Sequence, residues 1–115
     1  MRDKDITSHD RLGHIQEAME KIETFMKGHT RESFLKDEVI ISATLFQFAI
    51  VGEAIRYVSN EILDKYNYPW HKVRGFRNFI LHEYHAISYR VIWNTVKEDL
   101  PQLKKKITEI LRKEF

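Results

Sequence analysis

The feature that most limits how this chain can fold is an uncharged stretch of fourteen residues, 39–52, between Glu38 and Glu53. It is rich in Val, Ile and Phe, residue types that also suit a strand. The segment from Asp37, a suitable N-cap, to about Ser59 nevertheless runs for about 22 residues without proline or a turn signal, whereas strands usually have about 4 to 8. We therefore predict a long helix. Because a membrane span needs roughly 20 apolar residues, we expect this helix to lie in a protein core.

A second helical pattern precedes this segment. Thr7 and Ser8 are suitable N-cap residues, and Gly28 is a suitable C-terminal stop. Between them apolar residues recur at spacings of three and four, which predicts a first helix. These residues are Leu12, Ile15, Met19, Ile22 and Phe25. The polar residues 29–36 predict a loop or a short helical turn.

Three further helices are expected in the second half of the chain. Pro69 and Trp70 suit the start of a third helix, after a segment rich in turn residues. Ser88 is a candidate N-cap for a fourth helix, which is expected to end near Asp99. Pro101 then begins a last helix with an apolar stripe.

Together these segments predict an all-α fold, an up-and-down bundle of four to five helices in a single domain of residues 1–115. A chain of this length can close a core without disulfides or metal. It contains no cysteine, which excludes thiol catalysis and cysteine-ligated zinc. Its first residues are polar and lack the apolar run of a signal peptide, so we expect a cytoplasmic protein with no membrane partner.

Positive charge is concentrated in one part of the chain. The formal net charge is only +2, yet from Lys65 to His82 there are four Lys or Arg, two His and no acid. This electropositive segment leads into residues 77–84, Arg-Asn-Phe-Ile-Leu-His-Glu-Tyr. An anionic ligand is therefore expected near residues 77–84.

A helical map predicts how this stretch is arranged. If residues 73–85 form one helix, each residue advances about 100° around the axis. The polar side chains then share one arc, and with Arg77 at zero they lie at about −20° (Tyr84), 60° (Arg74), 80° (His85), 100° (Asn78) and 140° (His82). Phe76, Phe79 and Ile80 are expected to pack into the bundle on the other side. This polar arc can be a functional site, or it can be the ordinary solvated face of a surface helix.

The residues of this arc suit chemistry on a phosphate, since none of them is an acid. Arg77 can bind phosphate oxygens in a bidentate manner, Asn78 can orient it with Arg74 in support, and His82 can move a proton near neutral pH. This is sufficient for a ribose 2′-OH to attack its own phosphodiester, so we predict neither metal nor cofactor. A metal site formed by His82, Glu83 and His85 is a less favoured interpretation than metal-free chemistry, because no second helix supplies further carboxylate ligands.

Gly52 and Glu53 interrupt the apolar character of the long helix, and Glu53 is a possible accessory residue of the site. Gly52 costs a helix about 1 kcal/mol relative to Ala, which indicates a packing or a functional reason for it. Of the two we favour the close approach of a neighbouring helix. Glu53 is expected either to pair with a basic side chain or to face solvent. No nucleophile elbow and no glycine-rich phosphate loop is present among the four glycines.

The spacing of Arg77, four residues, His82, one residue and Tyr84 resembles the signature motif of HEPN-domain ribonucleases. The surrounding sequence resembles the HepT toxins of prokaryotic toxin–antitoxin pairs. Further landmarks of this resemblance occur in order along most of the chain from Asp37 onward: Gly52-Glu53-Ala54, Pro69-Trp70, Arg77-Asn78, and Trp93 through Asp99-Leu100-Pro101.

The resemblance implies a HEPN-like helical bundle that forms a homodimer, with motif residues of two chains facing each other in a composite cleft. It implies that Arg77 and His82 are the catalytic pair of a metal-independent RNA endonuclease, the toxin of a type VII-like pair. The implied partner is a MntA-like minimal nucleotidyltransferase antitoxin, which would neutralise the toxin by transferring AMP to Tyr84. His85 stands where this family often has an apolar aromatic residue, and we interpret it as a surface substitution rather than an assistant in the chemistry.

Two alternatives from other functional classes are open at this point. One is a non-catalytic HEPN interaction module that binds a nucleotidyltransferase partner or nucleotides, with the same residues serving recognition. The other is a plain structural bundle, in which replacing Arg77 and His82 would change neither toxicity nor binding.

Overall fold

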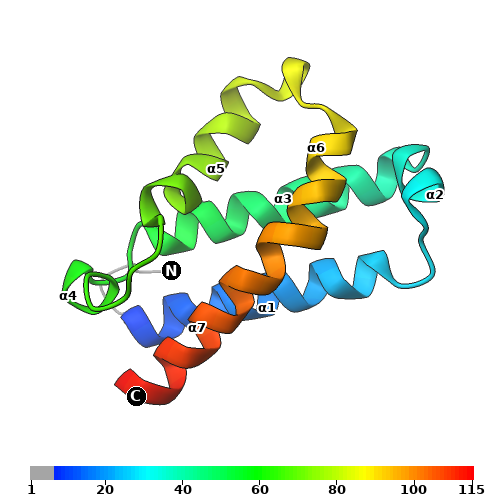
Figure 1. Ribbon diagram of the computed structural model, residues 1–115. Helices are drawn as coiled ribbons and strands as arrows, with labels where there is room; N and C mark the ends of the chain where they lie inside the picture. Colours follow the sequence, from blue (N-terminus) through cyan, green and yellow to red (C-terminus); the bar gives the residue numbers. More distant parts are fainter. Residues whose placement is uncertain (1–6) are drawn as a thin grey trace.

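The computed structural model describes residues 7–115 (Figure 1). The polar residues 1–6, on which the expectation about a signal peptide rests, lie outside this range. Within it every regular element is helical, which confirms the predicted all-α class. The elements are α1 (Ser8–Met26), α2 (Arg31–Leu35), α3 (Glu38–Ile55), α4 (Asn60–Leu63), α5 (Trp70–His82), the 3-10 helix η2 (Tyr84–Ala86), α6 (Tyr89–Asn94), the π-helix η3 (Thr95–Asp99) and α7 (Leu100–Glu114).

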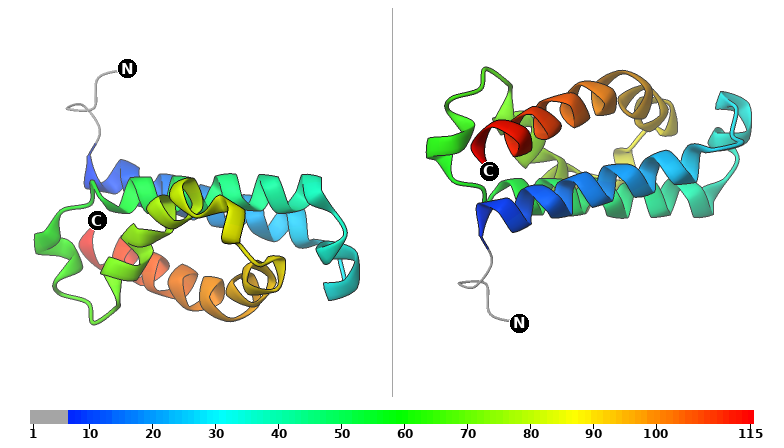
Figure 2. Two further views of the ribbon diagram at one scale, coloured as in Figure 1. Left: turned by 90° about the horizontal axis from the view of Figure 1, so that it is seen from above. Right: turned by 90° about the horizontal axis from the view of Figure 1, so that it is seen from below.

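The helices pack around α3. α1 runs side by side with α3, α5 packs on α3, and α7 packs on α1 (Figures 1 and 2). α3 has the most extensive contacts, which it makes with α1 on one side and α5 on the other. The predicted apolar helix is therefore the centre of the bundle, and it determines where α5 lies.

α3 serves as a core helix, as predicted. It is the one helix in the described part of the chain with the length and hydropathy of a membrane span. One side of it is buried in the bundle, including Ile41, Phe48 and Val51. The opposite side leaves Val39 and Phe46 77% and 64% exposed. α3 therefore presents an apolar outer face in addition to its buried one.

The capping predictions for α1 and α3 are confirmed. The Thr7 side chain accepts from the backbone N–H of Asp10, and Asp37 accepts from that of Ile40. Gly28 follows α1 with φ of 79°, which favours glycine. α3 ends at Ile55 rather than near Ser59.

The end of α3 differs from prediction because Ser59 has another partner. Its backbone N–H donates to Ser8 Oγ at 2.9 Å, which attaches the chain after α3 to the start of α1. Val58 is buried beside it. α4 then forms a short helix where the sequence predicted only a turn.

The predicted break before Pro101 is wrong. The chain stays helical from Tyr89 to Glu114, with η3 between α6 and α7. Proline lacks an N–H, and its ring would meet the carbonyl of Lys97, four residues earlier, in a regular α-helix. The wider π turn of η3 contains Lys97 and accommodates this proline.

Trp70 fixes the start of α5 through the hydrogen bonds of its indole N–H. Its buried Nε1 donates to the backbone oxygens of Leu63 at 3.1 Å and Tyr66 at 3.2 Å.

Trp70→Phe should lower the free energy of unfolding by about 1 to 2 kcal/mol, because the hydrogen bonding of this N–H is lost in a buried position. Denaturant unfolding will measure it. Trp93→Phe is the matched control, because the Trp93 ring packs on Phe34 without an Nε1 hydrogen bond in the described structure. An equal loss in both variants would contradict the assigned role of the Trp70 Nε1 bond.

Candidate functional site

The candidate site begins at the crossing of α3 and α5. A Cβ atom added to Gly52 would lie 2.7 Å from the backbone N of Arg77 and 3.1 Å from its Cβ. A backbone atom cannot rotate away from such a contact. The predicted close approach at Gly52 is confirmed, and it brings the backbone of α5 against α3 at Arg77.

Glu53 and Arg77 pair across this crossing. Arg77 Nε lies 3.3 Å from Glu53 Oε2, and Arg56 Nη1 donates to Glu53 Oε1 at 2.9 Å. The pairing of Glu53 with a basic side chain is therefore confirmed. Arg56 is a second partner that sequence reasoning missed, although its spacing of three residues from Glu53 on one helix was the available signal.

This pairing determines which edge of the Arg77 guanidinium is accessible. The Arg77 side chain is 33% exposed, and Glu53 occupies its Nε side. Nη1 makes a long hydrogen bond of 3.4 Å to Asn78 Oδ1. The Nη groups are thus the edge that can donate to two oxygens of a phosphate.

His82 is the last residue of α5 and is exposed. Within residues 7–115 its ring has no hydrogen-bond or ion-pair partner. The step of five positions from Arg77 to His82 corresponds to roughly 7.5 Å of rise and 140° of rotation. The two side chains therefore leave α5 in different directions within one chain.

The helical map is wrong beyond His82. Glu83 ends α5, and Tyr84 begins η2, so Tyr84 and His85 are outside the helical register of Arg77. All side chains from Glu83 to Ala86 are exposed, and without packing nothing stabilises a further helical turn there. The expectation that Tyr84 nearly eclipses Arg77 is thus incorrect.

Tyr84 lies on the loop between α5 and α6 and is 72% exposed. Its ring is edge-on to that of His85, with centroids 5.7 Å apart. His85 Nε2 lies 4.0 Å from Glu83 Oε2. The Tyr84 hydroxyl has no hydrogen-bond partner among the described residues.

Phe79 also departs from the map, because it is 47% exposed rather than packed into the bundle. Arg77, next to Gly52, marks the side of α5 that faces α3. Phe79 lies about 160° around the helix from that side. Phe76 and Ile80 are partly buried as predicted, and the Phe76 ring packs on Phe48 with centroids 5.6 Å apart.

Arg74 has a partner away from the other arc residues. Its Nη2 donates to Asn60 Oδ1, on α4, at 2.8 Å. This bond holds the guanidinium toward the start of α5, so a supporting role in phosphate binding stays a prediction. His82, Glu83 and His85 do not form a metal-ligand group, and no three His, Asp or Glu side chains converge in this way among residues 7–115.

Comparison with known proteins shows which family of proteins the chain resembles. A family model described as "Ribonuclease HepT-like" matches residues 15–110. The chain belongs to the HepT-like ribonuclease family. This membership confirms the resemblance inferred from the sequence and the predicted class of enzyme, a ribonuclease.

Individual members of the HepT-like family resemble the chain over most of its length. A protein of Caldanaerobacter subterraneus subsp. tengcongensis, named as a candidate RNase, is 36% identical over 90% of this chain and 93% of its own. A protein of Thermococcus cleftensis, named "Probable ribonuclease HepT", is 38% identical over 90% of this chain and 94% of its own. No solved structure matches the chain.

Proposed function

We propose that this HepT-like protein is a metal-independent RNA endonuclease in which Arg77 binds the scissile phosphate and His82 transfers protons. The 2′-oxygen would form a bond to phosphorus as its proton leaves, and the bond from phosphorus to the 5′-oxygen would break as that oxygen gains a proton. The products would carry a 2′,3′-cyclic phosphate and a 5′-hydroxyl. The observation that carries this proposal is the guanidinium of Arg77, which Glu53 holds on its Nε side while the side chain stays 33% exposed and Nη1 makes only a long hydrogen bond to Asn78.

We further propose that the active cleft is shared by two chains of a homodimer. Arg77 and His82 diverge within one chain, so the His82 of one protomer would act with the Arg77 of its partner. An exposed apolar face beside Arg77 supports this arrangement. Val39 and Phe46 lie fourteen and seven residues before Glu53 on one face of α3, and Leu81, one turn beyond Arg77, is 48% exposed.

The proposed biological role is that of a cytoplasmic toxin neutralised by a MntA-like nucleotidyltransferase antitoxin. AMP transferred to the Tyr84 hydroxyl would add a bulky anion near the positively charged site. Since Tyr84 is not in register with Arg77, the adduct would act across the shared cleft rather than along α5. Its 72% exposure supports access by the transferase.

RNA cleavage by the purified protein in EDTA tests the endonuclease proposal. We expect single-stranded RNA to be cut to fragments with the stated ends, and an oligonucleotide with 2′-deoxyribose at the cut position to remain intact there. Cleavage of the deoxy substrate would overturn attack by the 2′-OH. Tight binding of the nucleotidyltransferase without any RNA turnover would instead support the non-catalytic interaction module.

Intact-mass measurement tests the modification. Protein made together with the nucleotidyltransferase should carry an adenylate-sized mass increment that is lost in Tyr84→Phe. Tyr66→Phe is a matched control, because Tyr66 is half-buried with its hydroxyl bonded to Glu114. An increment that persists in Tyr84→Phe would show that another residue is modified.

Glu53→Ala provides a further prediction about Arg77. Without the carboxylate, the guanidinium loses the partner that fixes its Nε side, so kcat/KM should fall by about tenfold, corresponding to roughly 1.4 kcal/mol. Glu20→Ala, an exposed acid of α1, removes the same charge and should leave cleavage unchanged. Equal cleavage by Glu53→Ala and Glu20→Ala would contradict a positioning role for Glu53.

A further inference from the structure

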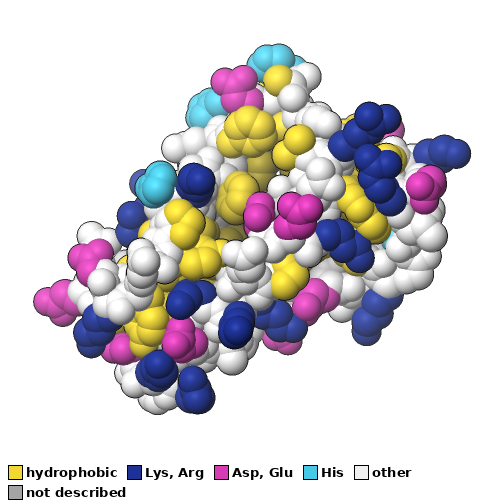
Figure 3. All heavy atoms as spheres, viewed as in Figure 1, with side chains coloured by type: hydrophobic (Ala, Val, Ile, Leu, Met, Phe, Trp, Pro, Cys, Tyr) yellow, Lys and Arg dark blue, Asp and Glu magenta, His cyan; other side chains and the backbone are white. Residues whose placement is uncertain are grey.

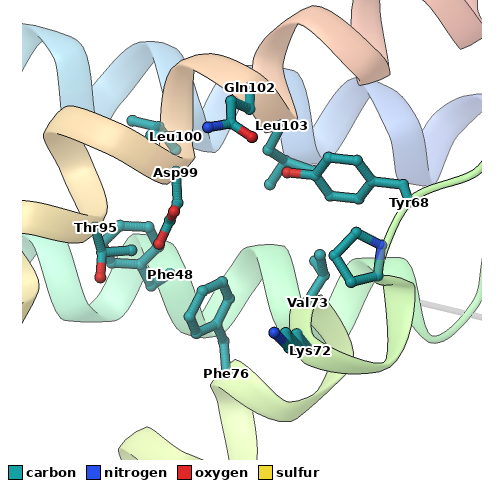
Figure 4. Close-up of a pocket in the computed structure, with 11 residues that line it drawn as sticks. Phe48, Tyr68, Lys72, Val73, Phe76, Thr95, Asp99, Leu100, Gln102 and Leu103 are labelled. Atoms are coloured by element: carbon teal, nitrogen blue, oxygen red, sulfur yellow. The ribbon is translucent and has the colours of Figure 1, made fainter.

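A separate pocket lies between α5 and the η3–α7 segment, with a volume of about 300 Å³ (Figure 4). Figure 3 shows hydrophobic side chains along the seam between α5 and this segment. Phe76 reaches the pocket from α5, and it leaves the helix about 100° around from Arg77. The pocket is thus on a different side of α5 from the residues proposed to cleave RNA.

Aromatic side chains form two sides of this pocket. Phe76 and Phe48 pack on each other on one side, and Tyr68 lies across the pocket from them (Figure 4). Buried Val73, Leu100 and Leu103 complete the apolar walls. A volume and lining of this kind suit a planar aromatic ring system.

Polar groups lie along the α7 side of the pocket. Asp99, Gln102 and the Tyr68 hydroxyl are on this side, with Lys72 opposite on α5 (Figure 4). Gln102 Nε2 donates to the backbone oxygen of Glu98, which leaves its Oε1 as an acceptor. Burial, and after it the charge of Asp99, raises the pKa of Tyr68 above its ordinary value, so the phenol stays protonated.

Asp99 has two acceptor oxygens with no hydrogen-bond donor or ion-pair partner among the described residues. It is the last residue of the π-helix η3, and Thr95, the first, also lines the pocket. π-helical turns are found frequently at functional sites. The π turn therefore places an unpaired carboxylate at the edge of an aromatic pocket.

We propose that this pocket binds a guanine base. Guanine presents two adjacent donors, N1–H and the C2 amino group, which match the two oxygens of Asp99, and its O6 is an acceptor for Lys72. Its rings would lie between Phe76 and Tyr68. Adenine lacks this pair of adjacent donors on one edge, so the carboxylate selects against it.

The base can come from a free nucleotide or from a guanosine within RNA, and binding titrations distinguish these sources. The ligands are guanosine monophosphate (GMP) and a fully 2′-deoxy oligonucleotide with a single guanine, which resists 2′-OH attack. Tighter binding of GMP identifies a free nucleotide, and tighter binding of the oligonucleotide identifies a nucleic-acid base. The pocket does not depend on the proposed cleavage, because binding is measured without turnover.

The substitution Asp99→Asn tests whether the carboxylate selects the base. Asn replaces one acceptor by an N–H donor, so it should bind xanthosine monophosphate (XMP), which has a carbonyl at C2, in preference to GMP. Wild-type protein should prefer GMP over both XMP and adenosine monophosphate by at least about tenfold. Glu98→Gln, at the adjacent position outside the pocket, is the control and should keep the wild-type preference.

Two outcomes would overturn the guanine site. One is wild-type protein that binds GMP no better than adenosine monophosphate. The other is an Asp99→Asn variant whose ratio of GMP to XMP affinity equals that of the wild type. Because Asp99→Asn is expected to gain affinity for XMP, a misfolded variant cannot produce the predicted result.

Discussion

His82→Ala should reduce the rate of RNA cleavage by about 10²- to 10⁴-fold, the range expected when a general acid–base group is removed. His82 is exposed at the end of α5, and its ring has no partner among the described residues whose loss would disturb the fold. The free energy of unfolding should therefore stay within about 0.5 kcal/mol of the wild type. Single-turnover cleavage in EDTA and denaturant unfolding measure the two quantities separately.

His85→Ala is the matched control for this variant. His85 is also exposed, three residues from His82, and its ring lies edge-on to Tyr84 and 4.0 Å from Glu83 Oε2. We expect it to retain cleavage, in line with its interpretation as a surface substitution. If His82→Ala cleaves RNA at the wild-type rate, the assignment of His82 is wrong; if His85→Ala alone is inactive, the proton transfer belongs to His85.

Gly52→Ala should lower the free energy of unfolding by about 1 to 3 kcal/mol, the usual cost of overfilling a packed contact. The new methyl group would lie 2.7 Å from the backbone N of Arg77, so α5 has to move away from α3. Ala is otherwise the better helix former by about 1 kcal/mol, and a net loss would therefore report the contact itself. The displacement also separates Arg77 from Glu53, so cleavage should fall as well.

Gly75→Ala is the control for this effect. Gly75 is on α5, two residues before Arg77, and a Cβ added there would have nothing within 4 Å. We expect Gly75→Ala to stabilise the protein by up to about 1 kcal/mol through helix propensity alone. Thermal unfolding measures the change in Tm of both variants. If the crossing at Gly52 is as tight as described, Tm should fall in Gly52→Ala and rise in Gly75→Ala. A rise in Tm in both variants would contradict the tight crossing.

Much of the scaffold is predictable from local sequence. The caps at Thr7 and Asp37 and the glycine at Gly28 act through neighbouring residues, so their chemistry is visible in the sequence. The close approach at Gly52 was also predictable, because an apolar helix contains glycine at a cost. The identity of the neighbour, Arg77, depends on how α3 and α5 cross, which no local pattern encodes.

The error at Tyr84 has a different cause. Helical propensity does not change after His82, and no proline or glycine marks the end of α5. The helix stops where tertiary packing stops, and tertiary packing supplies most of the stability of a short helix. Phe79 is exposed because α3 packs on the opposite side of α5, and the sequence does not encode the direction from which α3 approaches. The aromatic pocket beside η3 was not predicted because its residues come from three separate parts of the chain, position 48, residues 68–76 and residues 95–103.

The central claim is that Arg77 of one chain acts with His82 of another, and mixed dimers test it directly. Arg77→Ala and His82→Ala are each expected to be inactive alone. When the two variants are co-expressed and assemble at random, half of the dimers contain one of each, and one of the two clefts in such a dimer is intact. We predict recovery of about one quarter of wild-type cleavage. Formation of mixed dimers without any recovery of cleavage would contradict a shared cleft.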